Sequence, residues 1–343
     1  MEFYLGTWQV SPSDGFWTDQ DISESEKVIS QAVRMGICGF DTAQSYGKGR
    51  SEQTLAKVLR RFSSFSSFSK PSNVSSFSKP TKPSSVSKPT KPSSFIKPSN
   101  VSTPTKTFQI DTKVMPSTKS VKEILDVSRS RLSPYGIDCL YLHWPRSGFD
   151  HVAFLRQMED LRECGQIGKV GICNMPLKDL EGVVASGIVV DRIQIPLSLL
   201  WTRDLAETKA FCTENNIRIA AYSPTGMGLL SGKYKESSDL SDNRAGMFCF
   251  RESCHRQYLE LLELLKEISE AHKTSCTKVA LAWTASKKPD IILIGARNTE
   301  QLKQNLSDSV SLTETELSDL GAAAQKLDEK SRKICSNIFS YDF

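Results

Sequence analysis

Short apolar or β-branched runs recur along the chain and are separated by longer stretches with helical periodicity. The runs span residues 3–7, 37–41, 108–114, 138–143, 169–173, 190–195, 217–222 and 291–295. They are too short for buried helices, so each run predicts a strand. The stretch 257–286 predicts two helices in succession, and residues 313–327 predict a last one.

Three of the helical patterns open with Ser or Thr followed three residues later by Glu, which is the signature of a capping box. The pairs are Ser23 with Glu26, Ser120 with Glu123, and Thr313 with Glu316. Strand and helix alternate eight times, which predicts an α/β fold of the (β/α)8 TIM barrel type. A doubly wound open sheet is the competing architecture. It requires a glycine fingerprint after the first strand, and residues 5–10 lack one.

The pattern breaks at residues 62–106, which are rich in Ser, Pro and Lys. Two repeats lie within this insert, SKPTKPSS at 78–85 and 87–94, and KPSNVS at 70–75 and 97–102. The insert holds seven of the chain's 15 prolines and has no hydrophobic period, so burial cannot offset the entropy lost on ordering. We therefore predict one barrel domain, residues 1–61 and 107–343, interrupted by a disordered insert.

The insert offers weak binding signals. PTKP at 80–83 and 89–92 has the PxxP spacing of a ligand for a protein partner. Phenylalanines between its lysines would suit single-stranded nucleic acid, but nothing else in the chain supports that reading. Such short patterns arise easily in biased sequence, so a solvated linker is the preferred interpretation.

The net charge of +5 comes from the insert. The insert contains seven lysines and no Asp or Glu, so the rest of the chain has 37 cationic and 39 anionic residues. Because the rest of the chain is nearly neutral, we expect no nucleic-acid partner. The nine cysteines include no CxxC pair, which argues against a disulfide framework and against a metal site. No signal peptide or membrane span is indicated, so we expect a cytoplasmic protein that does not bind membranes.

Polar groups gather where the predicted strands end. The strands finish in FDTA, DTKV, LHWP, GICN, QIP, AYSP and IGAR. In a (β/α)8 barrel the functional groups lie at these strand ends and in the loops that follow them. The insert follows a helix and precedes a strand, so we expect it at the opposite face, away from the functional site.

These ends belong to seven motifs, in order DTAQSYG, TKV, HWP, GICN, QIP, AYSPTGMGLLSGKY and IGARNTEQLKQN. Together they resemble the aldo-keto reductase superfamily, and more closely its branch related to bacterial reductases and potassium-channel β-subunits. The resemblance covers nearly the whole chain except the insert. It implies an NADP-dependent oxidoreductase, without a metal, that reduces aldehydes or ketones to alcohols by hydride transfer from the nicotinamide.

Carbonyl reduction also needs a proton for the oxygen. A phenol with a pKa of about 10 is a poor acid at neutral pH unless its anion is stabilised. Tyr46 can meet Lys113 from the neighbouring strand, whose ammonium favours the phenolate. Asp41 would pair with Lys113 and keep it charged. The resemblance adds His143, which would orient the carbonyl and share in proton transfer.

Each of these four residues has a plain structural alternative. An Asp at a strand end often caps a turn, a buried Tyr or His often serves packing, and a Lys in TKV is often a solvated strand end. Their coincidence at successive strand ends favours the catalytic interpretation.

The resemblance also assigns residues to the cofactor. Asn174 and Gln194 match residues that hydrogen-bond the nicotinamide carboxamide, and Tyr222 matches the aromatic ring on which nicotinamide stacks. The family usually has Ser before that Asn, whereas this chain has Cys173, a weaker hydrogen-bonding group that is open to oxidation. A small residue selected for its volume explains Cys173 equally well.

Other positions match cofactor contacts of the family. Arg297 would bind a 2′-phosphate bidentately, which favours NADP over NAD, although it could equally be a surface charge. Arg244, in the loop 235–252, could close over the cofactor. The remaining matches are Thr7, Trp8, Asp41, Ser223, Pro224, Gly228, Leu229, Lys233, Gly295, Gln301, Gln304 and Asn305.

The expected substrate pocket is aromatic, which indicates an apolar or aromatic carbonyl compound as the small-molecule substrate. It comprises Trp8, Trp17, Tyr46, His143 and Trp144, with Trp201 as a further candidate. The tryptophans could also be core packing. Two other functions stay open: a cofactor-binding regulatory or redox-sensing subunit, and a degenerate reductase. His143 favours an enzyme, because the channel subunits have another residue at that position.

Overall fold

The computed structural model describes residues 1–12, 15–63, 108–307 and 310–337. Within them, eight parallel strands close into a barrel in chain order, which confirms the predicted (β/α)8 architecture. Each strand lies within two residues of its predicted run. The strands are β1 Glu2–Gly6, β2 Gly39–Asp41, β3 Gln109–Val114, β4 Cys139–Leu142, β5 Lys169–Cys173, β6 Arg192–Pro196, β7 Arg218–Tyr222 and β8 Ile291–Ile294.

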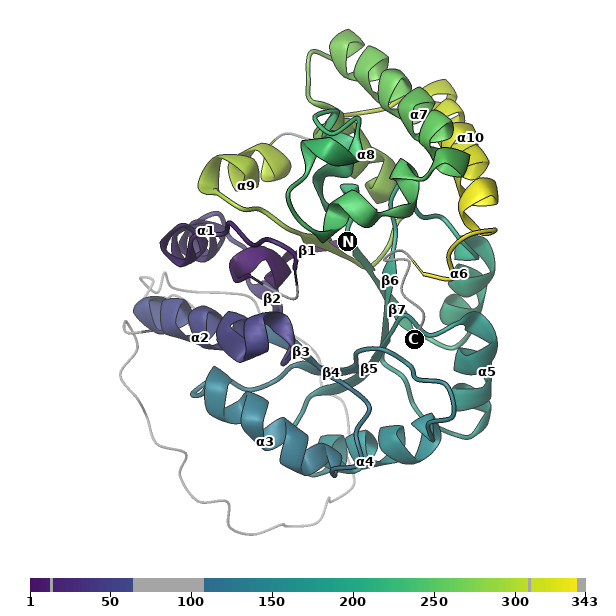
Figure 1. Cartoon of the computed structure of the whole chain (residues 1–343). Helices are drawn as coiled ribbons and strands as arrows, with labels where there is room; N and C mark the ends of the chain where they lie inside the picture. Colours follow the sequence, from purple (N-terminus) through teal and green to yellow (C-terminus); the bar gives the residue numbers. More distant parts are fainter. Residues whose placement is uncertain (13–14, 64–107, 308–309, 338–343) are drawn as a thin grey trace, which may run out of the picture.

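Helices surround the strand ring, as Figure 1 shows. They are α1 Ile22–Arg34, α2 Arg50–Ser63, α3 Val121–Leu132, α4 His151–Glu163, α5 Leu177–Ala185, α6 Leu205–Glu214, α7 Glu252–Ala271, α8 Cys276–Ser286, α9 Thr299–Leu306 and α10 Glu314–Ser331. The last helix, α10, packs against α7. None of the helices described here is both long and apolar enough to cross a membrane.

Local capping bonds fix where the helices begin. Ser120 and Thr313 form two of the three predicted capping boxes, at the starts of α3 and α10. The prediction for Ser23 was wrong. Asp21 caps α1, because its carboxylate accepts from the Glu24 backbone N–H at 2.9 Å, while the Ser23 hydroxyl donates to that same carboxylate at 2.6 Å. A carboxylate suits this position because a helix begins with unpaired N–H groups and a positive dipole end.

The chain reaches the insert through helix α2, which extends to Ser63 and so includes the first two residues of the predicted insert. Phe62 packs against the core below the guanidinium of Arg34. The described chain resumes at Phe108, whose ring packs edge-on against Phe40 at the start of the barrel. The rest of the predicted insert, with its PxxP motifs, lies outside the described residues.

The barrel interior carries charge as well as apolar side chains. Arg192 is 1% exposed and forms hydrogen bonds of 3.1 and 2.9 Å to the two carboxylate oxygens of Asp111. Its second terminal nitrogen donates to Asp138 at 2.9 Å. Buried ions are tolerated only where they are paired, so Asp111 and Arg192 depend on each other.

Two tyrosines fill the space around these ions by packing over glycines of adjoining strands. A Cβ atom at Gly39 would lie 2.2 Å from the ring of Tyr4, and one at Gly171 would lie 2.4 Å from the ring of Tyr141. Both distances are far below van der Waals contact, so any larger residue at either glycine would displace a ring from the close-packed interior.

Replacing Asp21 with Ala removes the α1 cap, and we expect the free energy of unfolding to fall by about 1 kcal/mol. Ser23→Ala is the matched control. It keeps the bond between the Asp21 carboxylate and the backbone, so we expect a change within about 0.5 kcal/mol. Equilibrium urea unfolding of both variants measures the difference. A larger loss for Ser23→Ala would restore Ser23 as the cap.

Candidate active site

A buried ion pair lies beneath the mouth of the barrel, at the ends of β2, β3 and β6. The Lys113 ammonium is fully buried, 2.5 Å from one carboxylate oxygen of Asp41, and donates to the Thr42 carbonyl at 2.8 Å. The Gln194 side-chain amide donates to the other Asp41 oxygen at 2.8 Å. Burial costs either charge its hydration, and these contacts offset that cost for the pair.

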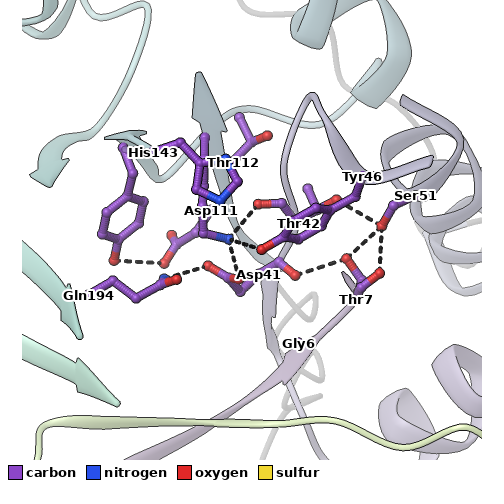
Figure 2. A network of polar contacts seen from close by, with 12 residues as sticks. Gly6, Thr7, Asp41, Thr42, Tyr46, Ser51, Asp111, Thr112, His143 and Gln194 are labelled. Atoms are coloured by element: carbon purple, nitrogen blue, oxygen red, sulfur yellow. Dashed lines mark hydrogen bonds and ion pairs between the residues drawn. The ribbon is translucent and has the colours of Figure 1, made fainter. Parts of the chain in front are cut away.

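Further hydrogen bonds hold the Asp41 backbone in place. The Thr7 backbone N–H and hydroxyl both donate to the Asp41 carbonyl at 2.9 Å. The Ser51 hydroxyl, at the start of α2, donates to the Thr7 carbonyl at 2.9 Å. Figure 2 shows Gln194, Asp41, Thr7 and Ser51 joined in one chain of polar contacts. The ion pair is therefore tied to β1, β2, β6 and α2 at once.

Tyr46 reaches the same ammonium from the short 3-10 helix Tyr46–Gly49 that follows β2. The Lys113 nitrogen lies 3.3 Å from the Tyr46 hydroxyl oxygen and 4.9 Å from the ring centroid. Burial raises the pKa of Tyr46 to about 12, while the positive charge of Lys113 acts to lower it. Burial is the larger effect, so the phenol holds its proton at neutral pH.

His143 follows β4 and faces the phenol. Its ring packs edge-on against Tyr46 with 5.6 Å between centroids, and its Nδ1 atom lies 3.5 Å from the Ser45 hydroxyl oxygen. Burial, followed by the charge of Lys113, lowers the pKa of His143 well below 6.5. The imidazole is therefore neutral at pH 7, so one ring nitrogen donates and the other accepts.

These side chains form one end of a cavity of about 590 Å³ at the mouth of the barrel. Most of the residues predicted from the sequence line it. They are Thr7, Trp8, Trp17, Asp41, Tyr46, His143, Trp144, Asn174, Gln194, Tyr222, Ser223, Pro224, Gly228, Lys233, Arg244, Gly295, Arg297, Gln301, Gln304 and Asn305. A cavity of this size and mixed lining is typical of a small-molecule site.

The side chain of Asn174 is held by two contacts. It accepts from the Tyr222 hydroxyl at 2.7 Å and donates to the His143 carbonyl at 3.2 Å. Its φ of 58° lies in the left-handed region, which Asn tolerates better than most residues. The amide is therefore presented to the cavity in one orientation.

Three of the residues predicted for catalysis or for the cofactor lie outside the cavity wall. Lys113 and Cys173 are buried beneath it, and Leu229 is part of the apolar core. The Cys173 side chain packs with Cys139 and Tyr141 inside the barrel, and burial raises its pKa well above that of an ordinary thiol. Because the reactive form of cysteine is the thiolate, Cys173 is poorly placed for oxidation.

Trp201, the further candidate for the substrate pocket, lies in the core, which is the alternative that the sequence left open. Its ring packs against Phe248 at 6.0 Å between centroids, and the guanidinium of Arg203 lies 4.0 Å above it. Trp201 belongs to the core beneath α7 and α10. An aromatic residue that follows a strand looks the same in the sequence whether it faces a cavity or a helix.

Two arginines line the cavity. Arg244 is 5% exposed, pairs with Asp242 at 2.8 Å and lies 4.6 Å from the centroid of Trp17. These contacts hold Arg244 as a fixed part of the wall. Arg297, on the loop before α9, contacts the loop between β1 and α1.

Sequence reasoning missed several lining residues. They are Gly6, Gln9, Phe16, Ser45, Met115, Thr225, Met227, Ser231, Tyr234, Ser275, Thr277, Leu293 and Ala296. Most come from loops, which have no periodic signal. Gln9 also explains why residue 295 is glycine, because a Cβ atom at that position would lie 2.3 Å from the Gln9 amide nitrogen.

Comparison with known proteins identifies the family. The model of the aldo/keto reductase family matches residues 2–325, so this chain belongs to that family of oxidoreductases. An aldo-keto reductase of Schizosaccharomyces pombe, named for NADP(+), is 28% identical over 54% of this chain and 56% of its own. An NADH-specific methylglyoxal reductase of Escherichia coli is 25% identical over 94% of each chain.

Solved structures agree with the fold. The glycerol dehydrogenase of Gluconobacter oxydans superimposes with a TM-score of 0.69 and 21% identity, over 94% of this chain and 91% of that one. At this identity the likeness establishes the (β/α)8 barrel and leaves substrate and cofactor preference open.

The neutral state of His143 predicts a pH dependence of stability. Because its folded pKa is depressed, the unfolded chain takes up a proton below about pH 6.5 that the folded chain does not, so stability falls as the pH falls below that value. Between about pH 7.5 and about pH 5.5 we expect the wild type to lose about 1.4 kcal/mol more than His143→Gln. Urea unfolding at both pH values measures this, and equal losses would contradict a neutral buried imidazole.

Proposed function

We propose that this protein is an NADP-dependent reductase of aldehydes or ketones, with Tyr46 as the general acid. The observation that carries the proposal is the phenol of Tyr46, which faces the cavity while its oxygen lies 3.3 Å from the buried Lys113 ammonium. A protonated phenol beside a fixed cation is what protonation of a carbonyl oxygen requires. The relatives support carbonyl chemistry, since one is named a methylglyoxal reductase.

The four residues act as follows. With a pKa of about 12, Tyr46 keeps its proton at neutral pH until a carbonyl oxygen that is gaining negative charge takes it. Lys113 then stabilises the phenolate electrostatically, and Asp41 keeps Lys113 oriented. His143 is neutral, so it can hydrogen-bond the same carbonyl oxygen without adding charge. When bound, the nicotinamide supplies the hydride.

The donors around the cavity fit a dinucleotide. The amides of Asn174 and Gln194 lie at the end that holds Tyr46. Three cations also line the cavity, and they suit phosphate groups: Lys233, Arg244 and Arg297. Arg297 favours NADP, because a guanidinium binds a 2′-phosphate better than a ribose hydroxyl. The named relatives differ in this respect, since one is named for NADP(+) and another is NADH-specific.

The cavity wall near Tyr46 favours an apolar or aromatic substrate. The Trp8 ring lies 6.2 Å from that of Tyr46, 4.9 Å from that of Phe16 and 5.5 Å from that of Trp17, measured between centroids. Trp144 also lines this wall. This group of aromatic rings offers an apolar surface against which a substrate ring can pack.

Replacing Tyr46 with Phe removes the proton donor and keeps the ring. We expect kcat for an aromatic aldehyde to fall by about a hundredfold or more, with NADPH binding nearly unchanged. Turnover is followed by the loss of NADPH absorbance, and binding by fluorescence quenching. Tyr4→Phe is the matched control, because it removes a buried phenol hydroxyl that donates to Gln109 inside the barrel.

Two outcomes would contradict this proposal. Tyr46→Phe with the turnover of the wild type would exclude Tyr46 as the acid. A wild type that binds NADPH and reduces nothing across a broad carbonyl panel would instead favour a cofactor-binding sensor or a degenerate reductase.

Arg297→Gln tests the cofactor assignment. Because Arg297 is assigned to the 2′-phosphate, we expect NADPH affinity to fall by about tenfold or more and NADH affinity to change little. Arg332→Gln is the control, since Arg332 pairs with Asp204 and Asp328 and does not line the cavity. Fluorescence titrations at one ionic strength measure both nucleotides. Equal weakening of the two would remove Arg297 from the phosphate site.

A further inference from the structure

The loop between β1 and α1 holds Arg297 through two neighbouring residues. The Gln20 side chain is buried; it accepts from Arg297 Nε at 3.0 Å and donates to the Arg297 carbonyl at 2.9 Å. Gln20 also donates to the Ser25 hydroxyl at 3.0 Å, which anchors it to α1. The guanidinium of Arg297 therefore has a fixed position at the edge of the cavity.

Asp19 forms an ion pair with that guanidinium. One of its carboxylate oxygens lies 2.8 Å from a terminal nitrogen of Arg297, and the Asp19 side chain is 62% exposed. The hydrogen bond from Arg297 lowers the pKa of Asp19, so the carboxylate is ionised at neutral pH. An anion of the chain itself thus sits where the proposed function places a phosphate.

We propose that Asp19 is a specificity-determining residue, which competes with the 2′-phosphate of the cofactor for Arg297 and so weakens the preference for NADPH over NADH. This inference rests on the proposed function, in particular on the assignment of Arg297 to the 2′-phosphate. It concerns Asp19, which no feature of the sequence singled out.

A guanidinium has a limited set of donors in one plane, and Gln20 already takes Nε. An incoming 2′-phosphate must displace the Asp19 carboxylate from the terminal nitrogen or remain beside it, where the two anions repel. A ribose 2′-hydroxyl carries no charge and can donate to a carboxylate. Asp19 therefore opposes NADPH and leaves NADH unopposed.

The size of the effect is limited by exposure. An ion pair between exposed groups is weak and is screened by salt. We expect Asp19→Asn, which removes the charge and keeps the size, to tighten NADPH binding by about fivefold and to leave NADH binding within about twofold. The gain should shrink in about 0.5 M salt, because screening weakens the repulsion that the wild type experiences.

Asp204→Asn is the matched control. Asp204 is also 62% exposed and pairs with an arginine, Arg332, at 3.1 Å, but it does not line the cavity. The Asp204→Asn substitution therefore changes the net charge by the same amount as Asp19→Asn, but away from the site. Titrations of the full chain with NADPH, NADH, 2′,5′-ADP and 5′-AMP measure the four affinities, and the last two isolate the 2′-phosphate without nicotinamide.

A double variant decides whether the effect passes through Arg297. In the Arg297→Gln background, Asp19→Asn should no longer change the ratio of NADPH to NADH affinity by more than about twofold, because its partner is gone. Three results would overturn the inference. The ratio of NADPH to NADH affinity in Asp19→Asn could equal that of the wild type, or it could be lower. It could also rise by the same factor in Asp204→Asn as in Asp19→Asn.

The failure of the proposed function gives a different pattern. If the wild type binds NADPH and Asp19→Asn binds it no more tightly, only the role of Asp19 is contradicted. A wild type that binds neither NADPH nor 2′,5′-ADP contradicts the cofactor assignment and the inference together.

Discussion

The ion pair between Lys113 and Asp41 is the constraint on which the mouth of the barrel depends. Removing two charges from water costs several kcal/mol per ion, so each charge must be surrounded by polar partners. Lys113 finds them in Asp41, the Thr42 carbonyl and the Tyr46 hydroxyl, and Asp41 in the Gln194 amide. The partners that make the pair tolerable therefore also bring a phenol and an amide to the cavity.

Burial and charge act on Tyr46 in opposite directions. The sequence predicts only the lowering of its pKa by Lys113, whereas the structure adds the larger opposing effect of burial. The result is a phenol that stays protonated at neutral pH, with a cation already in place for its anion. In the proposed reaction, stabilisation that is fixed before the charge develops needs no reorganisation. The neutral His143 fits the same arrangement, because a second cation beside Lys113 would be repelled.

Much of this arrangement could be predicted, because apolar runs mark strands and closure of a parallel barrel brings their ends together. Partnerships between distant residues could not. Arg192 and Asp111 are 81 positions apart and lie inside runs that read as ordinary strands. The prediction of the α1 cap was wrong for a local reason, because Asp21 and Ser23 both offer a side-chain oxygen within the same turn. Nor does any pattern mark Asp19 as the partner of Arg297.

The interior charges also define how the strands align. Alternate residues of a strand face the same side, so β3 points Asp111 and Lys113 inward, and β6 points Arg192 and Gln194 inward. A slip of two residues keeps the same face inward, so apolar packing alone discriminates against it weakly. Such a slip of β3 moves both of its charges, Asp111 and Lys113, about 6.6 Å along the barrel. Both ion pairs would then break, at about 3–5 kcal/mol for each buried charge left without a partner. The charges beside Tyr46 thus also fix the strand register that carries Lys113 to Asp41.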